Sequence, residues 1–189
     1  MFTEQIERFV DLLITNGSCN SEDRDIILYG VAIIVGYLLN IMTTLILGIV
    51  LGVVPQSLVF LATFSFLRTY AGGYHCEKAI NCYILSSGIV TFSLIIIKFM
   101  PKEYVLIGGV MMLILAGLII LMFAPVEAPN KPLNIAERRH HRKKAIIHLM
   151  VVSILAILLF VFRLNSFAFT ICIGVLLTSI LVFLQKILS

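Results

Sequence analysis

The sequence predicts an all-α, polytopic membrane protein with six transmembrane helices and an amphipathic helix at the N-terminus. Hydrophobic residues make up 60% of the chain and the mean hydropathy is +1.09, whereas soluble domains are about 45–50% apolar. Residues 26–67 contain no Asp, Glu, Lys or Arg, and neither do residues 80–97. Runs of this kind are long enough to cross a ~30 Å hydrocarbon core as helices. We therefore treat residues 1–189 as one integral-membrane domain.

The N-terminal segment, residues 1–17, is expected to form the amphipathic helix. Apolar residues recur at helical spacing with charged residues between them, and Asn16-Gly17 ends the pattern. The segment is too short and too charged to cross a membrane. It either lies on the membrane surface or packs on the protein's own cytoplasmic loops.

Six apolar runs follow, separated by Pro, Gly or charged residues. The expected spans are residues 26–54, 57–70, 83–99, 104–123, 145–162 and 167–184. The second is short, because residues 57–67 reach only ~16 Å at 1.5 Å per residue. This span either continues past Arg68 or ends below the membrane surface.

The Lys and Arg residues predict the orientation of the chain. Six spans place both termini on one side, and with that side in the cytoplasm 11 of the 14 Lys and Arg residues are cytoplasmic. We therefore expect a multi-pass plasma-membrane protein whose termini and 68–82 segment face the cytoplasm. The net charge of +4 is accounted for by this orientation, and we expect no nucleic-acid partner.

Residues 68–82 form a polar island that contains a His and two Cys residues. A thiolate is a nucleophile and an imidazole can remove and return its proton, so the segment indicates nucleophilic catalysis. In one continuous helix His75 and Cys82 would stand ~10 Å apart, too far for the ~3 Å that proton transfer requires. Because Gly72-Gly73 favours a break, we expect a loop carrying His75 to fold back over the start of a helix carrying Cys82.

Other assignments of the island stay open. Cys76 is the rival nucleophile, although neighbours in sequence tend to point apart. A third catalytic partner would be Glu77, which can orient the imidazole, or Asn81 or Ser86. In the alternative without catalysis, His75 and Cys82 never meet, and Arg68 only extends its charge to the membrane surface.

No disulfide framework, metal site or cofactor is expected. The four Cys residues, at positions 19, 76, 82 and 172, show neither paired nor metal-like spacing. Cys172 lies in an apolar run and is expected to serve packing. A thiol nucleophile requires a reducing compartment, which the cytoplasm supplies.

Several features together resemble the AgrB family of membrane endopeptidases. They are Arg68, the run Ala71-Gly72-Gly73-Tyr74-His75, Cys82 seven residues after the His, and a Pro-rich loop at 124–133 before a basic run. The resemblance covers essentially the whole chain. It implies a homodimeric enzyme that removes the C-terminal segment of an AgrD-like quorum-sensing propeptide through an acyl-enzyme thioester. An internal Cys or Ser of the peptide then closes a thiolactone or lactone ring.

The resemblance also implies roles for particular residues. Cys82 matches the nucleophile and His75 the base, while Arg68 and Gly73 match positions that the family needs; Cys76 is a departure. The basic run at 138–144 fits an orientation signal beside anionic lipids. It also fits a docking site for the acidic part of a propeptide, and its cations are Arg138, Arg139, Arg142, Lys143 and Lys144.

Two other classes of function remain as rivals. The first is a small peptide transporter or exporter without proteolytic chemistry, which the apolar spans would allow. The spans, however, lack the charged residues and the paired broken helices that usually mark transport paths. A non-catalytic membrane scaffold would tolerate Ser in place of Cys82, whereas the enzyme would not.

Overall fold

The computed structural model describes residues 2–16, 20–74, 79–127 and 134–188, and within these ranges the chain consists of helices and their connections. The prediction of an all-α fold is confirmed. The elements are α1 (Phe2–Thr15), a short 3-10 turn η1 (Ser21–Asp23), α2 (Arg24–Leu51), α3 (Val54–Ala71), α4 (Ala79–Phe99), α5 (Lys102–Phe123), α6 (Ile135–Val161) and α7 (Asn165–Leu188).

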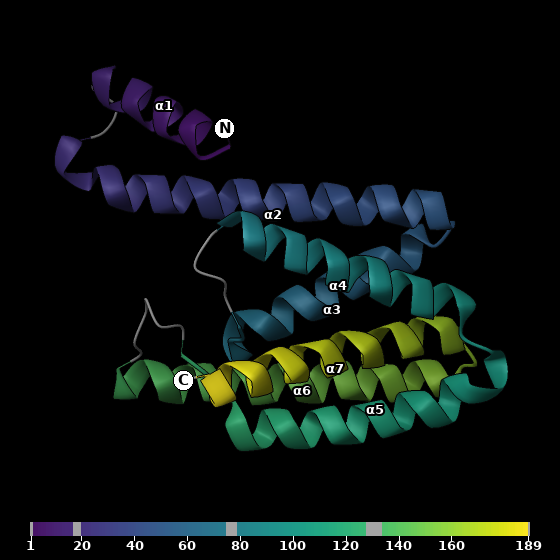
Figure 1. The fold of residues 1–189 in the computed structure, drawn as a ribbon. Helices are drawn as coiled ribbons and strands as arrows, with labels where there is room; N and C mark the ends of the chain where they lie inside the picture. The colour runs from purple at the N-terminus through teal and green to yellow at the C-terminus, as the bar shows by residue number, and fades with distance from the viewer. Residues whose placement is uncertain (1, 17–19, 75–78, 128–133, 189) are drawn as a thin grey trace.

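Helices α2 to α7 run back and forth between two opposite ends of the molecule (Figure 1). The short turns α2–α3, α4–α5 and α6–α7 lie at one end. The last turns of α3 and α5, the first turns of α4 and α6 and the end of α7 lie at the other. Among the described residues, five helices are long and apolar enough to span a membrane, namely α2, α4, α5, α6 and α7. Because α3 is not among them, the count of six spans stays a prediction.

The first and last turns of the helices follow local sequence signals. Gly52 ends α2 in the left-handed conformation, with φ of 69°, which glycine adopts without steric cost. Asn134 and Glu137 form a capping box at the start of α6. This cap starts α6 ten residues before the apolar run at 145, so the basic residues belong to the same helix as the span.

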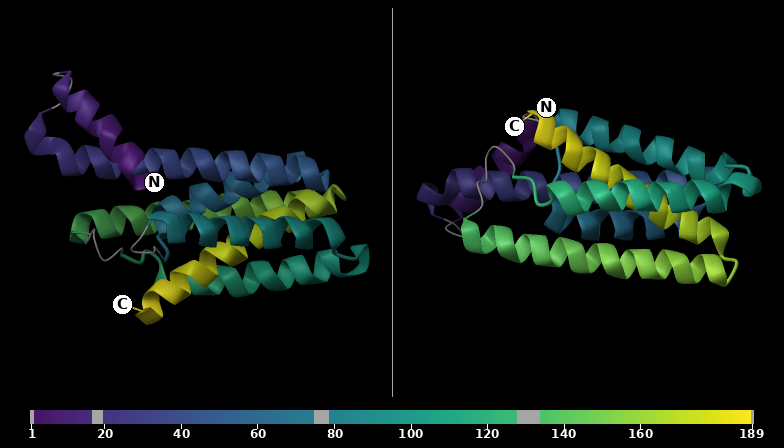
Figure 2. Two further views of the ribbon diagram at one scale, coloured as in Figure 1. Left: turned by 45° about the horizontal axis from the view of Figure 1, so that its top comes forward. Right: turned by 90° about the horizontal axis from the view of Figure 1, so that it is seen from below.

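Helix α7 forms the centre of the bundle and packs against α5, α3 and α6 (Figure 2). Cys172 on α7 is fully buried in the core that these helices share. Small residues bring the helices close together, as is usual where van der Waals packing drives association in a membrane. A Cβ added at Gly174, for example, would lie 3.1 Å from Thr63 Cγ2 of α3.

Helices α1 and α4 lie on the side of the bundle formed by α2. Helix α4 packs chiefly against α2 and has little contact with α7 or α3. Helix α1 also packs on α2, burying Ile6 and Val10. Asp11 accepts a hydrogen bond from Arg24 Nε at 2.9 Å, while Phe9 and Leu12 remain exposed. The amphipathic helix thus contacts the protein through one part of its apolar face and leaves another part uncovered.

Candidate active site at the α3–α4 connection

Cys82 is the fourth residue of α4 and its side chain is half-buried. It carries a free thiol. His75, Cys76 and Glu77 lie outside the described residues, so the expected approach of His75 to Cys82 stays a prediction. The structure does describe the chain on both sides of this segment, up to Tyr74 and from Ala79.

Tyr74, the residue before His75, is held by both α3 and α7. Its backbone N–H donates to Leu181 O of α7 at 3.1 Å. Its carbonyl accepts a hydrogen bond from Arg68 Nη2 at 2.7 Å. A hydrogen bond from a charged donor contributes about 1.5–3 kcal/mol. Arg68 therefore orders the backbone that leads to His75. An arginine that only extended its charge to the membrane surface would not need this hydrogen bond.

Gly72 and Gly73 make this turn possible, because both adopt positive φ values of 78° and 146°. The Gly72 N–H donates to Arg68 O and closes α3. A side chain at Gly72 would collide with the backbone carbonyl of Val126, and a Cβ at Gly73 would lie 3.2 Å from Leu181 Cβ. The pair is thus required both for conformation and for space.

A polar contact between α2 and α4 shows which way α4 faces next to Cys82. The hydroxyl groups of Thr43 and Tyr83 share a hydrogen bond of 2.8 Å. Tyr83 follows Cys82 directly, and successive residues on a helix point ~100° apart. Since Tyr83 is turned towards α2, the Cys82 side chain points to a different side of α4.

We expect this hydrogen bond to couple α2 to α4 by about 0.6–1 kcal/mol. Thr43→Val and Tyr83→Phe should each lower the free energy of unfolding, and the double variant should be no less stable than the worse single variant. Denaturant unfolding in detergent micelles measures this double-mutant cycle. Strictly additive losses would show that the two hydroxyl groups act independently.

An apolar groove of about 410 Å³ runs between α4 and α7 beside this connection. We call it the α4–α7 groove. Tyr74 lines it together with Leu85 and Ile89 of α4. Its α7 wall consists of Leu177, Ile180, Leu181, Leu184 and Leu188. Leu85 and Ile89 follow Cys82 by three and seven residues, and residues at these spacings share one face of a helix.

The basic run lies at the first turns of α6, near the end of α3. Its five cations, Arg138, Arg139, Arg142, Lys143 and Lys144, fall in the described part of the helix, and all but the half-buried Lys144 are exposed. The Tyr70 ring of α3 lies 4.9 Å from the His148 ring and 5.8 Å from the His141 ring, between centroids. His148 Nδ1 donates to Lys144 O at 2.7 Å. The structure therefore places the basic run on the helix that packs beside the Arg68 end of α3.

The α5–α6 connection links this basic end to α7. Arg138 Nη1 lies 3.8 Å from Glu127 Oε1. Gln185 Nε2 of α7 donates to Glu127 O at 3.1 Å, and the Val126 N–H donates to Ala71 O at 3.1 Å. Ser86, the remaining predicted site residue, is half-buried one turn after Cys82.

A sequence model described as accessory gene regulator B matches residues 6–183, which is nearly the whole chain. The chain belongs to the AgrB family. An AgrB-like protein 2 from Clostridium perfringens is 31% identical over 150 residues, covering 75% of this chain and 70% of the relative. An AgrB-like protein from Listeria innocua is 27% identical over 159 residues, covering 81% and 76%. No solved structure matches the chain.

Membership of the AgrB family agrees with the helices found, and we regard the chain as a membrane protein. The structure adds roles that the sequence did not predict. Tyr74, which the sequence marked only as part of the family-like run, holds the connection together with Leu181, while Thr43 and Tyr83 join α2 to α4. Tyr74 and Tyr83 carried a signal, because each is a polar aromatic residue next to a predicted catalytic position. Leu181 and Thr43 carried none.

Proposed function

We propose that this AgrB-family protein is a membrane cysteine endopeptidase that cleaves a quorum-sensing propeptide and cyclises it. Cys82 is the nucleophile and His75 the general base. Two observations support this most. The backbone of Tyr74, directly before His75, is held by two hydrogen bonds, and the half-buried Cys82 thiol lies in the first turn of α4. An ordered approach to the base is what proton transfer between two side chains requires.

The proposed reaction proceeds in two acyl transfers. His75 takes the proton of the Cys82 thiol, and the sulfur attacks the carbonyl carbon of the cleaved bond. The C–N bond breaks, the imidazolium returns the proton to the departing amine, and the peptide remains as a thioester on Cys82. An internal thiol or hydroxyl of the peptide then attacks the thioester, closes the ring and releases the Cys82 thiol.

Exchange of one thioester for another is nearly isoenergetic, so hydrolysis is the competing reaction. The thioester must be protected from water until the ring closes. The α4–α7 groove, which has an almost wholly apolar lining, lies on the Cys82 side of α4 and supports this requirement.

Other residues have supporting roles in this proposal. Arg68, Gly72 and Gly73 order the connection, while Glu77 or Ser86 would complete the site as a partner of the dyad. The basic run of α6 attracts an acidic segment of the propeptide or anionic lipids. The enzyme acts as a homodimer in the plasma membrane, with both termini and the α3–α4 connection in the cytoplasm.

The proposal is tested with purified protein in lipid vesicles and a candidate AgrD-like propeptide. Mass spectrometry should find the released C-terminal segment and a cyclic product one water lighter than the hydrolysed N-terminal fragment. A peptide transporter would instead move the intact propeptide across the vesicle membrane without producing either species. That outcome would overturn the proposal.

A further inference from the structure

We propose that the α4–α7 groove binds the apolar side chains that precede the cleaved bond of the substrate. This inference rests on the proposed function and adds a substrate preference to it. The groove lies between α4 and α7 because α4 packs chiefly against α2 and leaves its other side open. The candidate nucleophile, Cys82, shares a helix face with Leu85 and Ile89, which line the groove on that side.

Helix geometry places Cys82 on the same face of α4 as Leu85 and Ile89, the two α4 residues that line the groove. Around the axis of α4, Ile89 lies ~20° and Leu85 ~60° from Cys82, at 100° per residue. Tyr83 lies ~100° away in the opposite direction and faces Thr43 of α2. The rise from Cys82 to Ile89 is ~10 Å, which matches about three residues of extended peptide at ~3.3 Å each.

Tyr74 connects the groove to the other half of the candidate site. This residue lines the groove, and its backbone is bonded to Leu181, which also lines it. A side chain in the groove is therefore close both to the Cys82 face of α4 and to the residue before His75. A substrate bond held at the dyad has its neighbouring side chains within reach of this groove.

The lining decides which side chains the groove accepts. Among the described residues, every lining side chain apart from the Tyr74 phenol is Leu or Ile. A carboxylate or ammonium group placed there would lose its hydration without gaining a partner. A volume of about 410 Å³ falls within the ~300–1,000 Å³ of typical ligand sites. The groove thus favours apolar side chains and excludes the charged ones that the α6 end attracts.

The order of the reaction indicates which side of the bond occupies the groove. The amine segment leaves after the first acyl transfer, whereas the acyl segment stays bonded to Cys82 until the ring closes. Contacts that hold the acyl segment therefore act throughout the lifetime of the thioester. Apolar side chains filling the groove beside that thioester would also displace water from it.

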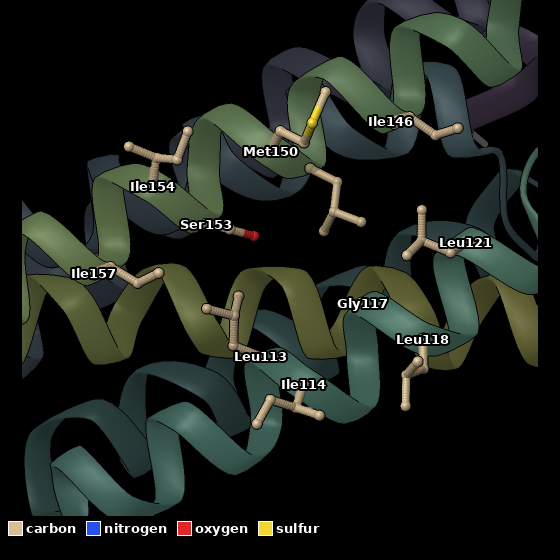
Figure 3. Close-up of a pocket in the computed structure, with 11 residues that line it drawn as sticks. Leu113, Ile114, Gly117, Leu118, Leu121, Ile146, Met150, Ser153, Ile154 and Ile157 are labelled. Atoms are coloured by element: carbon tan, nitrogen blue, oxygen red, sulfur yellow. The ribbon is translucent and has the colours of Figure 1, made fainter.

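A second apolar groove shows why location matters as much as lining. It lies between α5 and α6, measures about 460 Å³ and is lined by apolar side chains and Ser153 (Figure 3). None of the lining residues that the structure describes comes from the α3–α4 connection. Lipid chains fit either groove equally well by chemistry. The α4–α7 groove differs because Tyr74 lines it and because its α4 residues, Leu85 and Ile89, share a helix face with Cys82.

The two grooves provide a matched pair of variants. Ile180 of the α4–α7 groove is 41% exposed and Ile114 of the α5–α6 groove is 55% exposed, so both positions have space for a larger side chain. Ile180→Trp would fill the proposed subsite, and Ile114→Trp would fill the control groove. The probes are acetyl-Ala-Leu and acetyl-Ala-Asp chloromethyl ketones, with acetyl-Ala-Ala as the small reference. The Cys82 thiolate displaces chloride and forms a C–S bond, and mass mapping assigns the adduct to Cys82.

In the wild-type protein in vesicles, the Leu reagent should alkylate Cys82 at least about tenfold faster than the Ala reagent, with the Asp reagent slowest. Ile180→Trp should lower the Leu rate about tenfold and leave the Ala rate unchanged, while Ile114→Trp should change neither. Equal rates for all three reagents would overturn the subsite. An equal loss of the Leu rate in both Trp variants would also overturn the subsite, and would indicate that both grooves bind lipid chains.

Failure of the subsite and failure of the proposed function give different results. Unselective alkylation of Cys82, together with loss of propeptide cleavage in Cys82→Ala, would remove the subsite and leave the endopeptidase intact. Propeptide cleavage by Cys82→Ala would remove the function, and the subsite with it.

Discussion

Cys82→Ala is expected to abolish propeptide cleavage, with a rate at least about a thousandfold below that of the wild type. The reason is that no other atom in the first turn of α4 can replace the sulfur as the group that carries the acyl segment. Losses of this size or larger follow removal of the nucleophile in enzymes of this kind. The measurement is the rate of release of the C-terminal segment, followed by mass spectrometry in vesicles.

Two further variants show whether the loss is specific to the thiol nucleophile. Cys82→Ser preserves shape and should be nearly as inactive, because a hydroxyl is far less easily ionised than a thiol. A scaffold would tolerate this change. Cys76→Ala should keep near-wild-type activity, and His75→Ala should lose it. Full cleavage by Cys82→Ala with none by Cys76→Ala would move the nucleophile to Cys76.

Gly72→Ala is expected to have the second-largest effect, reducing cleavage by about tenfold or more. The Gly72 backbone has φ of 78° and ψ of −158°, a region that residues with a side chain rarely adopt. The added Cβ would also meet the Val126 carbonyl. Strain of this kind amounts to about 1–3 kcal/mol, which would displace Tyr74 and the segment after it. Gly73→Ala should be impaired for the same reason.

Gly88→Ala is the matched control for these glycine variants. Gly88 lies within α4, and a Cβ added there would meet no atom within 4 Å. Alanine is also the better helix former, so this variant should cleave the propeptide at the wild-type rate. Equal amounts of protein in the membrane must be confirmed for each variant. Wild-type cleavage by Gly72→Ala would show that the turn is not needed for the reaction.

Much of the fold could be predicted, because charge-free apolar runs of this length have few alternatives to helices. The packing of those helices against one another could not be predicted as well from the sequence. Both the lipid-facing and the core-facing sides of α4 and α5 are apolar, so hydrophobic periodicity does not show which side is buried. That α7 forms the centre, and that α4 packs chiefly against α2, is determined by side-chain fit. The early start of α6 follows from the Asn134–Glu137 cap, which extends the helix beyond its apolar run.

The candidate site was predictable in part for a related reason. Gly72-Gly73 and the isolated His and Cys residues are local signals, and they indicated a turn before the helix of Cys82. The hydrogen bond between Tyr74 and Leu181 joins residues more than a hundred positions apart. No local pattern predicts such a contact, since it uses backbone groups alone. The α4–α7 groove is equally hard to predict from the sequence, because its Leu and Ile residues cannot be told apart there from those that face lipid.

The acyl-enzyme itself provides the most direct measurement. Wild-type protein in vesicles is mixed with a candidate propeptide whose internal Cys or Ser has been replaced by Ala, so that ring closure cannot consume the thioester. After digestion at acidic pH, mass spectrometry locates any acyl group on the chain. We predict the N-terminal part of the propeptide in thioester linkage to Cys82, removable by hydroxylamine. An acyl group on Cys76, or release of the C-terminal segment with no adduct on any Cys, would contradict the account.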